Sequence, residues 1–201
     1  MQSMTMNWRF IKLTISCIIL SALVNGCVQP ADRKSAKADL TKGIRNDSIL
    51  LGIRFGDTQK EFREKCLALN KKHLTTEGPG YAVRYLVYDS LVHRDPTSIQ
   101  LLFVPGFDEK EILTDMDLKF SYLGWAPWNR RFQSESLKNK VIDLLMQWYG
   151  GNRFVVAHTG NDEVPVKVDG NRRMLIYEDA PQNVIVRIQD MSRSRDSQTI
   201  E

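Results

Sequence analysis

The sequence predicts an α+β fold with two layers, in which an antiparallel sheet is covered by two amphipathic helices. Two stretches carry apolar residues at helical spacing, one beginning at Phe62 and the other at Leu137. Several further stretches alternate apolar and polar residues, as strands with one covered face do. The order of helix, three strands, helix and three or four strands resembles a structural duplication, a tandem α-β-β-β repeat.

The first predicted helix begins after Thr58, which forms a capping box with Glu61. Its apolar face is expected to consist of Phe62, Cys66, Leu69 and His73. The Gly-Pro-Gly sequence at positions 78–80 breaks this helix before the next strand.

The second predicted helix has the more regular pattern, with Leu137, Val141, Leu144, Leu145 and Trp148 on one face. Ser134 or Ser136 is expected to cap its start, and Gly150 with Gly151 is expected to end it.

Short apolar or alternating runs predict the strands at 49–51, 81–88, 99–104, 112–120, 154–157, 164–168, 174–177 and 184–188. The run 99–104 is almost continuously apolar, which predicts a strand covered on both faces. Asp169-Gly170-Asn171 predicts a hairpin turn.

The amino terminus reads as a secretory leader. Arg9 and Lys12 precede an apolar run from Leu13 to Val24. This run of about 12 residues is too short for a membrane span, which needs about 20, but fits the apolar part of a signal peptide.

Leu23-Val24-Asn25-Gly26-Cys27 resembles a bacterial lipobox. The resemblance implies cleavage before Cys27 and acylation of Cys27, and two or three acyl chains make such an anchor durable. Val28 stands where an aspartate would be linked to retention in the inner membrane, so we expect the outer membrane, on either face. A plain signal peptide with an incidental cysteine and an uncleaved anchor remain alternatives.

These features divide the chain into a signal peptide (1–26), a lipidated tether (27–47), one α+β domain (48–190) and a flexible tail (191–201). The tether is polar and cannot fold alone. Without the two basic residues of the leader, 26 basic and 24 acidic residues remain, with no basic stripe, which argues against nucleic-acid binding. Cys66 is then the single unmodified cysteine, so no internal disulfide is expected, and it is read as a small buried hydrophobe.

The stretch from Gly52 to Glu61, with a capped helix, and the helix end Trp148-Tyr149-Gly150 resemble small bacterial envelope proteins. These include proteins similar to the β-lactamase inhibitor protein and the small lipoproteins of outer-membrane assembly machinery. The resemblance implies tandem helix-plus-sheet units and a binding or scaffolding role, and no catalytic residues can be transferred from it.

No nucleophile-elbow, Ser-x-x-Lys or Walker motif occurs in the sequence. The histidines at 73, 93 and 158 are far apart, and Asp115 and Asp117 fit the polar face of a strand better than a metal site. We therefore expect no cofactor, no metal and no catalytic residues.

One connection is a candidate binding surface, although we favour packing of its tryptophans onto the core. It contains the candidate surface residues Tyr122, Trp125, Trp128, Arg130 and Arg131. Aromatic residues and arginine dominate binding hot spots and also suit sugars or peptides. In the favoured interpretation, the loop folds back and its tryptophans pack onto the core beside Trp148.

Three functions remain open at this stage. The first is a lipid-anchored, non-enzymatic envelope module that binds a protein or glycan partner. The second is an envelope hydrolase in which His93 or His158 lies beside an acid. The third is a structural subunit of an outer-membrane lipoprotein assembly. The sequence does not specify the ligand or the oligomeric state.

Overall fold

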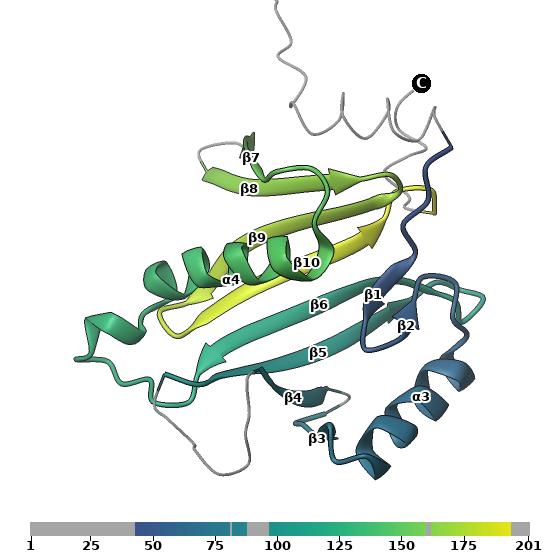
Figure 1. Cartoon of the computed structure of the whole chain (residues 1–201), viewed down its shortest axis with the longest axis horizontal. Coiled ribbons are helices and arrows are strands. Elements are labelled where there is room, and N and C mark those ends of the chain that lie inside the picture. Colours follow the sequence, from purple (N-terminus) through teal and green to yellow (C-terminus); the bar gives the residue numbers. More distant parts are fainter. Residues whose placement is uncertain (1–42, 81, 88–96, 160–161, 194–201) are drawn as a thin grey trace, which may run out of the picture.

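The computed structural model describes residues 43–80, 82–87, 97–159 and 162–193 (Figure 1). Within these ranges the helices are α3 (Gln59–Lys71) and α4 (Ser134–Tyr149), with a 3-10 turn, η2 (Arg130–Phe132). The strands β1 (Ser48–Leu50) and β2 (Ile53–Arg54) form a small antiparallel hairpin. The main sheet consists of β3 (Thr75–Glu77), β4 (Val83–Val87), β5 (Ile99–Phe107), β6 (Leu113–Tyr122), β7 (Val155–Thr159), β8 (Asp162–Asp169), β9 (Arg172–Ala180) and β10 (Asn183–Asp190).

The main sheet is antiparallel throughout, with the strand order β3-β4-β5-β6-β10-β9-β8-β7. Each helix precedes four consecutive strands, since α3 is followed by β3 to β6 and α4 by β7 to β10. The last strands of the two sets, β6 and β10, pair in the middle of the sheet. The predicted α+β class with an antiparallel sheet is therefore confirmed.

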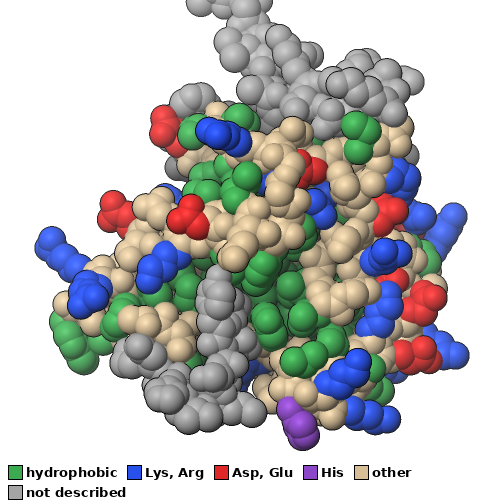
Figure 2. Space-filling model, viewed as in Figure 1, with side chains coloured by type: hydrophobic (Ala, Val, Ile, Leu, Met, Phe, Trp, Pro, Cys, Tyr) green, Lys and Arg blue, Asp and Glu red, His purple; other side chains and the backbone are tan. Residues whose placement is uncertain are grey.

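The core contains side chains from one face of the sheet and from both helices. Phe103, Leu118 and Val186 are cross-strand neighbours on β5, β6 and β10, and none of them is accessible to solvent. Phe62 of α3 meets Phe103 edge to face, with ring centroids 6.5 Å apart. Figure 2 shows further hydrophobic side chains on this side of the molecule, between α4 and the β1–β2 hairpin. One apolar cluster thus joins the helices to the sheet.

The helix α4 follows its predicted pattern, except at its start. Its predicted apolar residues Leu137, Val141, Leu144 and Leu145 are buried, and Trp148 packs against the core. The predicted serine cap is wrong, because Ser134 is the first helical residue and its hydroxyl donates to Glu178 instead. Gly150 ends the helix with a positive φ of 55°, as predicted.

The helix α3 begins with the predicted capping box, in which Thr58 and Glu61 bond each other reciprocally. The apolar face is shorter than predicted, because Phe62 is its one buried residue and the helix ends at Lys71. His73 lies beyond this end, with a positive φ of 58°, and is exposed. Its assignment to the apolar face was wrong, and α3 is attached to the core by a narrow contact.

Two strands also differ from the prediction. β5 alternates, with Phe103 buried and Val104 42% exposed, so it is not covered on both faces. The almost continuous apolar run did not indicate burial on both faces, because exposed aliphatic residues are common on solvated sheet faces. In β6 a bulge opposite Gly106 and Phe107 shifts the alternation, so that Leu113 and Met116 both face the core.

Residues 43–47, which the sequence assigns to the tether, lie against the sheet. The Asn46 N–H donates to Asn171 Oδ1 at 2.6 Å, and Asn171 Nδ2 donates to Asp47 Oδ1 at 3.0 Å. Asn171 lies in the predicted hairpin turn, which is confirmed, between β8 and β9.

Cys27, the rest of the tether, the leader and residues 194–201 of the tail lie outside the described residues. Among the described residues, neither α3 nor α4 has the length and apolar character of a membrane-spanning helix.

A buried ionic cluster lies at the end of the sheet that carries the β8–β9 turn. The Lys167 ammonium is inaccessible to solvent and lies 2.6 Å from Asp169 Oδ2. It also donates to the carbonyl oxygens of Gly150 (2.6 Å) and Asn152, just beyond the end of α4. Arg172 lies 3.5 Å from Asp169 and donates to the Ser48 carbonyl at 2.8 Å. The cluster therefore connects α4, the β8–β9 hairpin and the beginning of the domain.

Candidate functional site

The connection from β6 to α4 carries the candidate surface predicted from the sequence. At its start, Tyr122 is only 2% exposed and belongs to the core. Its ring lies 5.1 Å from that of Phe132, and the Lys140 ammonium lies 5.1 Å from its centroid. Tyr122 therefore packs in the core at the start of the loop and offers no surface to a partner.

The side chain of Gln133 holds the loop in one conformation. Its Nε2 donates to the carbonyl oxygens of Ala126 (3.1 Å), Pro127 (3.4 Å) and Asn129 (3.0 Å). Its Oε1 accepts a hydrogen bond from Trp125 Nε1 at 3.4 Å. Trp125 is half-buried and packs against the core. The side-chain amide of Gln133 thus bonds three backbone carbonyl oxygens and one indole of the loop, and no sequence motif predicts this role.

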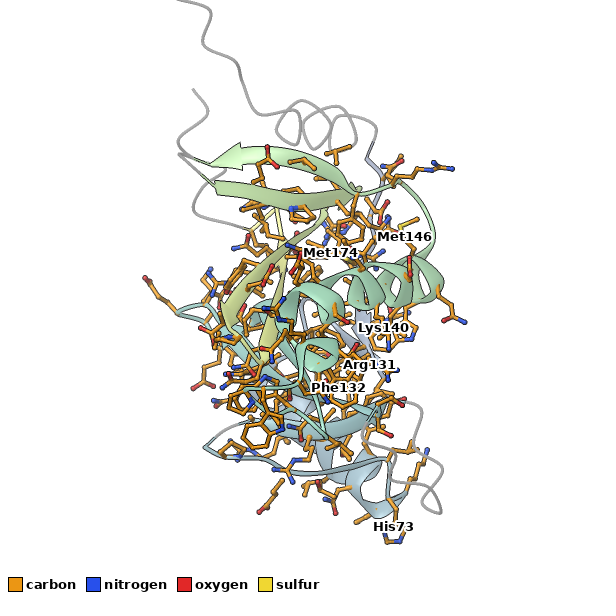
Figure 3. All side chains as sticks on the ribbon, turned by 90° about the vertical axis from the view of Figure 1, so that its left-hand side faces the viewer. His73, Arg131, Phe132, Lys140, Met146 and Met174 are labelled. Carbon is orange, nitrogen blue, oxygen red and sulfur yellow. The ribbon has the colours of Figure 1, made fainter. Side chains whose placement is uncertain are left out.

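Trp128, in contrast, points into solvent and is 85% exposed. Arg130 and Arg131, on the following 3-10 turn, are exposed as well. Figure 3 looks onto this end of the molecule, where Arg131, Phe132 and Lys140 face the viewer. Of the five predicted surface residues, the structure therefore exposes Trp128, Arg130 and Arg131, which we call the Trp128 surface. An indole next to two arginine side chains in the sequence can bind aromatic, apolar or anionic groups.

The Trp128 surface and the start of the domain lie at opposite ends of β9. At one end, Arg172 bonds the Ser48 carbonyl. Beyond the other end, the Ser134 N–H donates to the Pro181 carbonyl at 2.7 Å, directly after the Trp128 surface in the chain. The nine residues of β9 span about 27 Å between them.

On the opposite face of the sheet, Asp115 and Asp117 lie at polar positions beside Arg187, as predicted, and a second apolar cluster with Val166, Val168 and Leu175 lies further along the same face. The Asp117 carboxylate forms a two-pronged ion pair with Arg187, with both N–O distances at 2.8 Å. These hydrogen bonds raise the pKa of Arg187 above its ordinary value. Asp117 is thus an ion-pair partner, and within the described residues no group of acidic, histidine or cysteine side chains is arranged to hold a metal. His93 and the side chain of His158, on which the hydrolase hypothesis depends, lie outside the described residues.

A groove that the sequence analysis missed runs between α3 and the strands β3 to β5. Its volume is about 610 Å³, within the usual range for ligand sites. The apolar lining includes Phe62, Cys66, Leu67, Val83, Val104 and Phe107, and the polar lining includes Arg63, Asn70, Thr75 and Glu77. Leu67 is 57% exposed at its margin. A groove of this kind needs β3, a three-residue strand that no pattern in the sequence predicted.

Cys66 belongs to the wall of this groove, where it is half-buried and packs against the core. Burial raises the pKa of its thiol to about 11, which keeps it protonated at neutral pH. Its environment is that of the small apolar side chain proposed from the sequence.

Comparison of the chain with protein-family models, with curated protein sequences and with solved structures finds no match.

Proposed function

We propose that this chain is a bacterial lipoprotein, anchored through an acylated Cys27 in the cell envelope and most simply in the outer membrane, that binds a protein or glycan partner through the Trp128 surface. The domain acts as a non-enzymatic binding or scaffolding module. The observation that carries the binding role is the 85% exposure of Trp128 on a loop that Gln133 holds in shape.

Two physical properties of this loop favour binding. A large exposed indole is unfavourable in water, and covering it removes about 150–250 Å² of surface from solvent. A loop with a fixed conformation loses little further entropy when it binds, which favours affinity. Trp128 with Arg130 and Arg131 has the composition that dominates binding hot spots. The half-buried Trp125 stabilises the domain, so the two tryptophans have separate roles.

The proposed architecture supports presentation of this surface. We take the fold as two layers and as two α-β-β-β-β units joined through β6 and β10, an arrangement similar to the tandem helix-plus-sheet domains named above. The tether would emerge near Asn46, about 27 Å along β9 from the Trp128 surface. A partner could therefore be bound at a distance from the lipid anchor.

Purification of the acylated chain from detergent-solubilised envelopes tests this function. The Trp128→Ala variant is expected to lose the co-purifying protein or glycan, whereas Val156→Ala, a change at a site that is 54% exposed elsewhere, retains it. Retention of the same partner by Trp128→Ala would contradict the proposal. Mass spectrometry of the amino terminus tests the anchor separately, and an unmodified Cys27 within an uncleaved leader would disprove it.

A further inference from the structure

The strand β3 has an open backbone edge beside the α3 groove. β3 is the first strand in the order of the sheet, and only β4 pairs with it among the described strands (Figure 1). An edge strand with unpaired N–H and C=O groups is a template for another extended chain. The direction of these groups decides whether a ligand in the groove could reach them.

Two hydrogen bonds establish that direction. The Gly78 N–H donates to the Ala82 carbonyl at 2.9 Å, on the side of β4. Because backbone groups alternate along a strand, those of Thr75 and Glu77 point the opposite way. Asn70 Nδ2 of α3 confirms this direction, since it donates to the Thr75 carbonyl at 3.2 Å. The backbone N–H and C=O of Glu77 have no partner among the described residues and face away from β4.

The groove also contains a buried hydroxyl without a partner. Thr75 is 3% exposed, and its Oγ1 makes no hydrogen bond within the described part of the chain. Such a group normally costs stability, and a ligand that reaches it recovers part of that cost. Thr75 belongs to the same strand as the open edge and lines the groove.

The remaining lining fits an extended peptide better than a lipid-like molecule. Polar groups occur along both walls, from Gln59 and Arg63 on α3 to Glu77 on β3. An acyl chain would leave these donors and acceptors unused, whereas a peptide carries polar groups at each residue. The wall from Gln59 to Asn70 is about 16 Å long, which corresponds to about five extended residues.

We propose that the α3 groove binds an extended, uncharged segment of a partner protein, which adds a strand to the free edge of β3 and places alternate apolar side chains against Leu67 and Phe62. Backbone pairing at Glu77 supplies affinity, and the apolar floor selects the side chains. This site is separate from the Trp128 surface and goes beyond the proposed function.

The test uses residues 28–201, which include the whole core cluster from Ile49 to Ile188 and carry no acyl chain. The probe is the fluorescein-labelled peptide acetyl-Thr-Val-Thr-Val-Thr-Val-amide, measured by fluorescence anisotropy. The control peptide has proline at its centre, which removes one backbone N–H, and is expected to bind at least about tenfold more weakly. Equal binding of both peptides, or no binding of the first at 1 mM, would overturn the proposal.

Matched variants localise the site. Leu67→Ala is expected to weaken binding about fivefold, whereas Leu74→Ala, at an exposed leucine outside the groove lining, leaves it unchanged. Thr75→Val is expected to weaken binding by about threefold to tenfold while leaving the melting temperature of the free protein unchanged or higher, because it removes an unpaired buried hydroxyl. Equal effects of the two leucine changes, or a lower melting temperature for Thr75→Val, would contradict the inference. Trp128→Ala leaves this binding unchanged, which separates the two proposals.

Discussion

Lys167→Met is expected to be among the most destabilising single substitutions outside the apolar core. The ammonium of Lys167 has no contact with solvent and is 2.6 Å from the Asp169 carboxylate, itself 8% exposed. Removal of the charge leaves this carboxylate buried with a longer contact of 3.5 Å to Arg172. Breaking one partner of a buried pair costs about 3–5 kcal/mol, or a fall in melting temperature of about 10 °C for a domain of this size.

The assay is urea unfolding followed by far-UV circular dichroism, applied to Lys167→Met, Asp169→Asn and the double variant. Because Asp169→Asn removes the carboxylate that Lys167→Met would leave without its ammonium, the loss of stability of the double variant should be smaller than the sum of the single losses by at least about 1 kcal/mol. Arg172 then has no carboxylate beside it, so part of the loss remains. The carbonyl groups of Gly150 and Asn152 stay without their donor, so some loss remains. A cost below about 1 kcal/mol for Lys167→Met, or additive effects, would refute this reasoning.

Three further predictions follow from the loop and its surroundings. Trp128→Ala should change the free energy of unfolding by less than about 0.5 kcal/mol, while Trp125→Ala lowers it by more than about 1 kcal/mol; similar thermal scans for the two would contradict their separate roles. Gln133→Ala should raise protease cleavage within residues 125–129 with the core intact, and unchanged cleavage would show that the amide does not hold the loop. The hydrogen bonds from Lys138 and Ser134 lower the pKa of Glu178. The contribution of Glu178 to stability is therefore present above the unfolded pKa of about 4.3 and is lost as pH falls through the folded pKa. The stability difference between the natural protein and Glu178→Gln should vanish at low pH. A difference that does not depend on pH would be evidence against this pair.

The sequence was sufficient where structure depends on neighbours in the chain. The spacing of Leu137, Val141 and Leu145 reported α4 correctly, because helix burial follows a period of 3.6. The capping box at Thr58 and the turn at Gly170 were predicted for the same reason, since their hydrogen bonds or φ angles are local. The composition of the connection identified Trp128 as a surface candidate. It did not distinguish Trp128, which is exposed, from Trp125, which packs against the core.

The sequence did not predict contacts between residues that are far apart in the chain. Lys167 looks like a surface residue in an alternating strand, yet the end of α4 covers it, with Gly150 supplying one acceptor. β3 is short and made of Thr and Glu, which have no clear pattern, and it exists because β4 pairs with it. The α3 groove depends on this pairing and could not be anticipated. The role of Gln133 likewise depends on the path of a loop that no periodicity encodes.

The central claim is that Trp128 contacts a partner in the cell envelope. The most direct measurement places a photo-crosslinking amino acid at position 128, and as a control at the exposed position 156, in cells that make the acylated chain. The account predicts a discrete adduct with a protein or a glycan from position 128 and none from position 156. Folded, membrane-bound protein that gives no adduct from position 128, or the same adduct from both positions, would contradict it.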